Sequence, residues 1–210
     1  ISYLGKEENG WYDYVGDPVF FKNFPNDKRK EFCYVTSTVD TKGNQIEWED
    51  FDIGAPFIRK YRNYGGCGTY GIEGNTATRS SLSEGLTPIY RFADVLLTYA
   101  EASNKAEGSP NTLAYKCLNR VRDRAFGDQS HQYAGLTPEK FADAVFDEFG
   151  WENVFEFKRW FQLVRTEKVD EAVGKNTAIG ARLNANKENY LFPIPVRQCE
   201  LRGWKNNPGY

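Results

Sequence analysis

The spacing of apolar side chains changes near residue 86. From Thr87 onward apolar residues recur every three or four positions, whereas residues 1–85 show no such sustained period. A period of 3.6 is typical of helices with one buried face. The pattern predicts helices over residues 88–107, 110–125, 137–149 and 151–166. The first two are joined by a short link, which predicts a helical hairpin.

The ends of these helices carry capping residues. Three Ser/Thr-Pro pairs offer a hydroxyl for the N-cap and a proline for the first helical position: Thr87-Pro88, Ser109-Pro110 and Thr137-Pro138. The first helix is expected to end at Gly108 and the second near Gly127, while Gly150 separates the third from the fourth only weakly. The first helix should place on one side Ile89, Phe92, Leu96, Tyr99 and Ala100.

The first 85 residues are rich in Gly, Asn, Asp and aromatic residues. Short extended pieces are expected at residues 18–24, 31–39 and 57–61, with a turn at 40–44. Residues 46–52 suit either a strand or a loop. Near the C-terminus, residues 167–189 read mostly as loop, and the prolines of residues 190–195 favour extended chain.

These patterns predict a mainly α protein. We expect a loop-rich lobe with short strands over residues 1–85 and a helical region over residues 86–210, together forming one compact unit.

The composition excludes several classes of protein. The chain has 27 basic and 29 acidic residues, a balance that does not suit a nucleic-acid binder relying on phosphate neutralisation. No stretch approaches the ~20 apolar residues that span a bilayer. His131 is the single histidine, which excludes zinc sites built from several histidines, and its loop-like surroundings predict a solvated ring.

The chain also lacks methionine, and with it an initiator residue. We interpret it as a processed product or a fragment, so that a signal peptide or lipid anchor would lie outside it.

Four cysteines are widely separated and form no CxxC pair: Cys33, Cys67, Cys117 and Cys199. Free thiols are favoured over disulfides, although the three possible full pairings stay open.

Four segments of the helical half resemble the C-terminal region of the SusD/RagB family, in the order the family has them. They are YRFADVLLTYAEA at 90–102, LNRVRDRA at 118–125, EFGWENVFEFKRWFQLVR at 148–165, and YLFPIP at 190–195 with the closing NNPGY at 206–210. Looser similarities lie upstream, at NDKR (26–29) and PFIRKY (56–61). The close resemblance covers about residues 86–210.

The resemblance implies a fold and a role. Members are surface nutrient-binding lipoproteins of Bacteroidetes polysaccharide-utilisation systems, with helical hairpins of the tetratricopeptide (TPR-like) kind arranged in an α/α superhelix. It implies a binding component of the outer membrane, exposed at the cell surface and anchored by a lipid not present in this chain. Such a protein captures a glycan and delivers it to a SusC-like TonB-dependent transporter, without catalysis and without a cofactor.

The chain departs from the family at three places. Glu156-Phe157 stands where the family usually has Glu-Gly, Gln162 stands in place of Asp, and Asn153 replaces an apolar residue. These positions are structural in the family, so the changes predict local repacking.

Glu148, Glu152, Glu156 and Arg159 share one face if the third and fourth helices are nearly continuous. We expect ion pairs with arginines of neighbouring helices, namely Arg91, Arg120, Arg122 and Arg124. An alternative makes Glu152 and Glu156 the acid and nucleophile of a glycoside hydrolase, whose carboxyl groups lie about 5–10 Å apart. The structural network is the commoner arrangement.

Candidate ligand-binding residues are the rings in the polar, turn-rich first part: Trp11, Tyr12, Tyr14 and Trp48. Aromatic faces suit the C–H side of a sugar ring. The alternative is that these rings only pack the lobe, and that the chain is a scaffold that packs helical repeats and docks the transporter.

Other signatures are weak. The chain has no P-loop and no GxSxG motif, and the acidic run Glu47, Glu49, Asp50 and Asp52 lacks the ligand spacing of a calcium loop. We therefore expect no bound metal.

Overall fold

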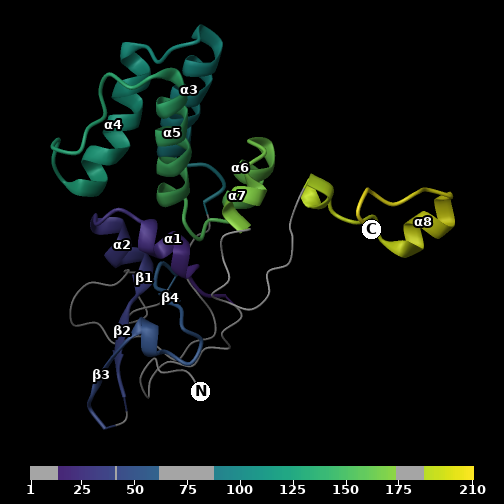
Figure 1. Cartoon of the computed structure of the whole chain (residues 1–210), viewed down its shortest axis with the longest axis horizontal. Helices are drawn as coiled ribbons and strands as arrows, with labels where there is room; N and C mark the ends of the chain where they lie inside the picture. Colours follow the sequence, from purple (N-terminus) through teal and green to yellow (C-terminus); the bar gives the residue numbers. More distant parts are fainter. Residues whose placement is uncertain (1–13, 41, 62–87, 174–186) are drawn as a thin grey trace. The chain divides into compact units, whose positions relative to one another are not determined.

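The computed structural model describes residues 14–40, 42–61, 88–173 and 187–210, and within these ranges it is mainly helical with a few short strands, as expected (Figure 1). The chain divides into two compact units, Ile1–Phe157 and Lys158–Tyr210. The boundary expected between residues 85 and 86 lies outside the described residues.

Two short helices open the first unit, α1 (Pro18–Asn23) and α2 (Lys28–Cys33). The prediction of extended chain is therefore wrong for residues 18–23 and 31–33. Each helix starts at an aspartate whose carboxylate accepts a backbone N–H: Asp17 from Phe20 and Asp27 from Arg29, both at 2.8 Å. These caps hold a helical turn despite the β-favouring aromatic residues that follow.

The strands form two antiparallel pairs. β1 (Tyr34–Val35) pairs with β4 (Phe57–Ile58), and β2 (Ser37–Val39) pairs with β3 (Gln45–Glu47). The expected turn after β2 is confirmed, because the Asp40 carboxylate accepts the backbone N–H groups of Lys42 and Asn44 at 2.7 and 2.8 Å. Residues 46–52 divide between the end of β3 and a 3₁₀ turn, η1 (Trp48–Asp50).

An aromatic core fills this lobe. Tyr34, 2% exposed, meets the rings of Phe21, Phe24 and Phe155 edge-on, with centroids 4.8, 5.7 and 5.0 Å away. Edge-to-face contacts of this kind add about 0.5–1.5 kcal/mol each to the burial of the rings. A lobe with so little regular structure is therefore held mainly by its rings.

Three longer helices form the second core: α3 (Phe92–Glu107), α4 (Thr112–Phe126) and α5 (Pro138–Glu152). They lie side by side, with α3 and α4 forming the expected hairpin (Figure 1). Gly108 and Gly127 end α3 and α4 with φ of 71° and 86°, a left-handed conformation that glycine adopts at little cost.

Only one of the three predicted N-caps is correct. Thr137 caps α5, whereas α4 begins two residues later than expected, because the Asn111 side chain accepts the Ala114 N–H at 2.8 Å. Helix α3 begins after Arg91, whose backbone N–H donates to Asp94 Oδ2 at 2.7 Å. In both cases a planar side-chain oxygen, rather than a hydroxyl, accepts the free amide.

The buried face of α3 also differs from the prediction. Leu97 and Ala100 are fully buried, while Ile89, Phe92 and Tyr99 are 80%, 59% and 39% exposed. Polar residues complete the buried face, since Asn104 donates from Nδ2 to the Pro138 carbonyl at 2.9 Å. Small and polar side chains thus allow α3 to lie close to α5.

Helix α5 continues through Gly150 to Glu152, so the break expected at Gly150 is absent. The chain then turns, with Phe155 and Phe157 at φ of 63° and 59°. The resemblance leads us to expect glycine at position 157, and glycine adopts a left-handed backbone at little cost. The chain keeps this conformation although the residue there is phenylalanine. A side chain with a Cβ in this conformation carries about 1–2 kcal/mol of strain.

The second unit contains α6 (Arg159–Arg165), α7 (Val169–Val173), η2 (Lys187–Tyr190) and α8 (Val196–Arg202). Its C-terminal chain folds back on itself, because Asn206 accepts the Ile194 N–H at 2.7 Å and Asn207 donates to the Phe192 carbonyl at 2.6 Å. Residues 192–195, which lie between η2 and α8, are neither helix nor strand, in keeping with their prolines.

Replacing Phe157 with glycine should stabilise the protein by about 1 kcal/mol, because it removes the left-handed strain and Phe157 is 70% exposed. The matched control is Phe161→Gly. Phe161 is 68% exposed but lies inside α6, where glycine should destabilise by about 1 kcal/mol. Urea unfolding of both variants measures these opposite effects, and a loss of stability in Phe157→Gly would contradict the argument.

Candidate functional site

A buried ion-pair cluster joins the loop-rich lobe to the helices within the first unit. Its glutamates, Glu148, Glu152 and Glu156, are 0%, 4% and 4% exposed. A buried carboxylate stays charged only where cations and donors replace its water. The complete ion-pair cluster consists of Asp27, Arg29, Lys60, Arg91, Arg122, Arg124, Glu148, Glu152 and Glu156.

Glu148, one turn before the end of α5, receives one guanidinium on each oxygen. Arg29 of α2 donates from Nη1 to Oε1, and Arg122 of α4 donates from Nη1 to Oε2, both at 2.7 Å. Arg29 is itself held by Asp27 at 2.6 Å between Nη2 and Oδ2. One arginine therefore links the start of α2 to the last turns of α5.

Glu152, one turn further along α5, receives three arginines. Arg91 lies 2.8 Å from Oε1, Arg29 lies 3.1 Å from Oε2, and Arg124 Nη2 lies 2.5 Å from both oxygens. Both oxygens of Glu152 are thus occupied by donors.

Glu156 lies beyond the helix, on the turn after α5. Lys60 donates to its Oε1 at 2.6 Å, and Arg91 Nε donates to its Oε2 at 3.0 Å. Lys60 also donates to the Val154 carbonyl at 3.1 Å, so the segment after β4 is fixed to this turn.

The predicted network is partly correct. Glu148 and Glu152 share a face of α5 and pair with arginines of other helices, but α5 ends before Glu156. Arg159 belongs to the second unit, where its Nη1 donates to Gln162. Arg120 lies over the Phe92 ring, 5.0 Å from its centroid.

Sequence reasoning assigned no role to three members of the ion-pair cluster, Asp27, Arg29 and Lys60. A signal for them was present, because the two looser similarities, NDKR and PFIRKY, contain all three. The glutamates that Arg29 and Lys60 contact lie about a hundred positions away in the sequence, so spacing alone did not reveal the pairing.

The charges set the protonation of these glutamates. Burial alone would raise the pKa of Glu152, but the hydrogen bond from Arg91 and the charges of Arg124 and Arg29 outweigh it, and the pKa is lowered. The pKa of Glu156 is likewise lowered, because Lys60 and Arg91 outweigh burial. For Glu148, the most buried of the three, burial prevails and raises the pKa.

This arrangement does not resemble a hydrolase site. A glycosidase acid must hold a proton near neutral pH and reach the substrate. Glu152 and Glu156 have lowered pKa values and occupied oxygens, while Glu148 has no exposed surface. The ion-pair cluster therefore positions the lobe.

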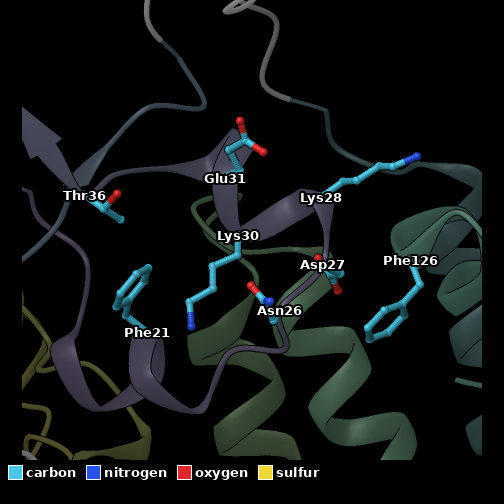
Figure 2. A pocket seen from close by; sticks show the side chains of 8 residues that line it. All are labelled: Phe21, Asn26, Asp27, Lys28, Lys30, Glu31, Thr36 and Phe126. Carbon is cyan, nitrogen blue, oxygen red and sulfur yellow. The ribbon is translucent and has the colours of Figure 1, made fainter.

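A pocket of about 420 Å³ lies beside α2, between α1 and the end of α4 (Figure 2). We call it the polar pocket. Figure 2 shows Phe21 and Phe126 on opposite sides of it, with Lys30 and Asn26 between them. Its lining comprises Phe21, Asn26, Asp27, Lys28, Lys30, Glu31, Thr36 and Phe126.

Several polar side chains in this pocket are available to a ligand. Among the described residues, the side chains of Asn26, Glu31 and Thr36 form no hydrogen bond or ion pair. An amide, a carboxylate and a hydroxyl together supply both donors and acceptors, which is what a neutral, hydroxyl-rich molecule requires. The rings are less available, since Lys30 lies 4.5 Å from the Phe21 centroid and Phe126 stacks on His131.

The predicted aromatic residues are dispersed. Tyr14 is 77% exposed, whereas Trp48 is 7% exposed and lies between the Phe21 ring and Lys22, each 5.5 Å away. Trp11 and Tyr12 lie outside the described residues. Ligand contact by these four residues stays a prediction.

The described part of the chain contains no group of three His, Cys, Asp or Glu residues that could hold a metal, and none of its helices is long and apolar enough to cross a membrane. Cys33, Cys117 and Cys199 are free thiols, while Cys67 lies outside the described ranges. Burial raises the pKa of the Cys33 thiol to about 11, so it is protonated at neutral pH. His131 is exposed, as predicted.

Comparisons of the sequence with known proteins all indicate the same family. The model of the SusD family matches residues 5–210. SusD-like protein P2 of Formosa agariphila is 33% identical over 96% of this chain and 41% of its own length. SusD-like protein P25 of the same organism is 29% identical over 94% of this chain and 34% of its own length. The chain thus spans well under half the length of these relatives.

Solved structures share the fold. A SusD superfamily protein of Bacteroides vulgatus gives a TM-score of 0.69 at 21% identity, over 99% of this chain and 47% of its own. Surface glycan-binding protein A of Bacteroides uniformis gives 0.64 at 24% identity, over 96% of this chain and 42% of its own.

Glu148→Gln should destabilise the protein by about 3–5 kcal/mol, because it leaves the buried guanidinium of Arg122 without its counter-charge and removes one of the three carboxylates around Arg29. The control is Glu139→Gln, on the exposed side of the same helix, with an expected change below about 1 kcal/mol. Urea unfolding monitored by circular dichroism measures both. Equal stability of the two variants would show that the ion-pair cluster contributes nothing.

The stabilisation that Glu152 and Glu156 contribute should be lost as the pH drops below about 4.5, whereas Glu148, whose pKa is raised, acts in the opposite direction. The folded pKa values of Glu152 and Glu156 lie below the ordinary value of 4.5, so their contribution is complete above that pH and is lost on acidification. Unfolding free energies between pH 3 and 7 test this. Glu156→Gln should lose stability less steeply in acid, whereas Glu139→Gln should keep the wild-type slope, and identical slopes would contradict the assignment.

Proposed function

The chain belongs to the SusD family, and on that premise we propose that it is a non-catalytic part of an outer-membrane nutrient-uptake system that captures a glycan at the cell surface. The observation that carries the proposal is the family match over residues 5–210. A structural neighbour of the same fold is a surface glycan-binding protein, which supports a carbohydrate as the ligand.

The polar pocket supplies suitable groups for a sugar. Asn26, Glu31 and Thr36 offer hydrogen bonds to hydroxyls without breaking any hydrogen bond between described residues. We propose that exposed aromatic residues add stacking contacts, with Tyr14 the accessible one among the described residues. Trp11 and Tyr12 belong to the same proposal, and Trp48 would act from within the aromatic core.

The absence of catalysis is also part of the proposal. The candidate acid and nucleophile, Glu152 and Glu156, are both occupied by cations. Their role in the ion-pair cluster supports binding without hydrolysis.

We further propose that the captured glycan passes to a SusC-like TonB-dependent transporter. The protein would act at the outer surface of the outer membrane, attached through a lipid anchor. Family membership supports this assignment.

A scaffold role is the second candidate, and the surface of α3 favours it. A row of apolar side chains lies exposed along and just before this helix: Ile89, Tyr90, Phe92, Val95 and Tyr99. Helical repeats bury such faces against neighbouring repeats. In that case the chain would pack other helices and dock the transporter without touching the glycan.

A glycan array followed by calorimetry decides between the two. If the chain captures a glycan, Tyr14→Ala and Asn26→Ala should each weaken binding about 3–10-fold, through a lost stacking or hydrogen-bonding contact. Tyr90→Ala, which removes a similarly exposed tyrosine just before α3, should leave affinity unchanged. Absence of binding to every glycan would contradict capture and favour the scaffold role.

A further inference from the structure

A second pocket, of about 490 Å³, lies on the other side of α2 and touches the ion-pair cluster. We call it the cationic pocket. Two carboxylates line it, Glu152 and Glu156. Five cations line it, namely Lys28, Arg29, Lys60, Arg91 and Arg124. The remaining lining is mostly apolar: Phe32, Cys33, Tyr61, Pro88 and Ala125.

The positive charge of this pocket exceeds what its carboxylates neutralise. Glu152 already receives three arginines, and Glu156 already receives Lys60 and Arg91. Counting Asp27, Glu148 and Arg122 as well, the ion-pair cluster with Lys28 contains six cations and four carboxylates. Asp128 lies near Lys28 without forming an ion pair to it. A surplus of cations in a hollow raises the local concentration of anions.

Two of these cations have free hydrogen-bonding capacity. The Arg124 side chain is 60% exposed and uses Nη2 for Glu152, and among the described residues its Nε and Nη1 have no hydrogen-bond partner, so they are open to a ligand. Lys28 is exposed, and within the described residues its ammonium forms no hydrogen bond or ion pair. An arginine edge and a lysine bind carboxylate and sulfate oxygens through charge-assisted hydrogen bonds.

The pocket also offers a ring. Phe32 is 52% exposed and lies four residues after Lys28 on α2, so the ring and the ammonium share one face of the helix. A sugar ring could place its C–H side on Phe32 while its acidic group meets Lys28 and Arg124.

We propose that the cationic pocket binds the carboxylate or sulfate group of an acidic glycan, with Lys28 and Arg124 as the residues that select it. This inference rests on the proposed function and specifies the class of glycan. The polar pocket, which shares Lys28, has two cations and two carboxylates in its lining and suits an adjoining neutral sugar.

The test uses an array of neutral, uronate-containing and sulfated oligosaccharides, followed by calorimetry of the tightest binder. Acidic oligosaccharides should bind best, and raising sodium chloride from 50 to 500 mM should weaken them several-fold. Lys28→Gln should weaken binding roughly tenfold, because it removes one charge-assisted hydrogen bond. Lys116→Gln is the matched control, since Lys116 is an exposed lysine of α4 outside both pockets.

Arg124→Gln should also weaken binding, and its unfolding curve must be recorded because Arg124 pairs with Glu152. Lys28→Gln keeps the test decisive if Arg124→Gln is unstable. Binding of neutral glycans alone would overturn this inference and leave the proposed function standing. Binding of no glycan would overturn both. If acidic glycans bind Lys28→Gln and folded Arg124→Gln with the same affinity as the wild type, the assignment to this pocket is overturned.

Discussion

Arg29 is the residue on which the first unit depends. Its side chain extends from α2, a helix of six residues in the lobe, to two glutamates of α5. Asp27, the N-cap of α2, holds the Arg29 guanidinium in place. Burying these charges costs several kcal/mol of hydration free energy for each ion. The buried carboxylates are therefore stable only because a hydrogen-bond donor contacts each of their oxygens. That requirement fixes the register between α2, α4 and α5. It adds to the apolar contact that Trp151 of α5 makes with the aromatic core of the lobe, while the three helices pack around a second, aliphatic core.

The same short helix carries both residues that hold the fold and residues that could bind a ligand. Arg29 and Cys33, four residues apart, face inward, where Arg29 reaches the ion-pair cluster and Cys33 joins the aromatic core. Lys28 and Phe32, also four residues apart, are exposed. Because residues at i and i+4 share a face, a helix of six residues can carry both pairs, and all four of these residues line the cationic pocket. The ion-pair cluster therefore holds the backbone from which Lys28 and Phe32 extend.

The sequence predicted the longer helices better than the lobe. Glycines at 108 and 127 and the periodic apolar residues of α4 and α5 are local signals, and local signals determine where a long helix ends. The buried face of α3 was misjudged because its exposed side holds the larger apolar residues, while Ala100, Ser103 and Asn104 are buried. Helix α2 was partly read as strand, since three turns of context are needed before a period of 3.6 shows. The sequence predicted that the glutamates of α5 form ion pairs, but it did not predict their partners in the lobe. Arg29 and Glu148 lie 119 positions apart, and a contact between residues so distant produces no periodic pattern in the sequence.

The departure at Phe157 shows how a fixed ion-pair cluster transmits constraint along the chain. Glu156 must return to Lys60 and Arg91 although α5 has ended four residues earlier. The intervening turn achieves this by placing Phe155 and Phe157 in left-handed conformations on either side of Glu156. Phe155 has compensation, because its ring packs on Tyr34 in the aromatic core, whereas Phe157 is largely exposed and has no such contact in that core. The strain at Phe157 is therefore the cost of holding Glu156 in the ion-pair cluster, and it falls on the residue whose side chain contributes least to the fold.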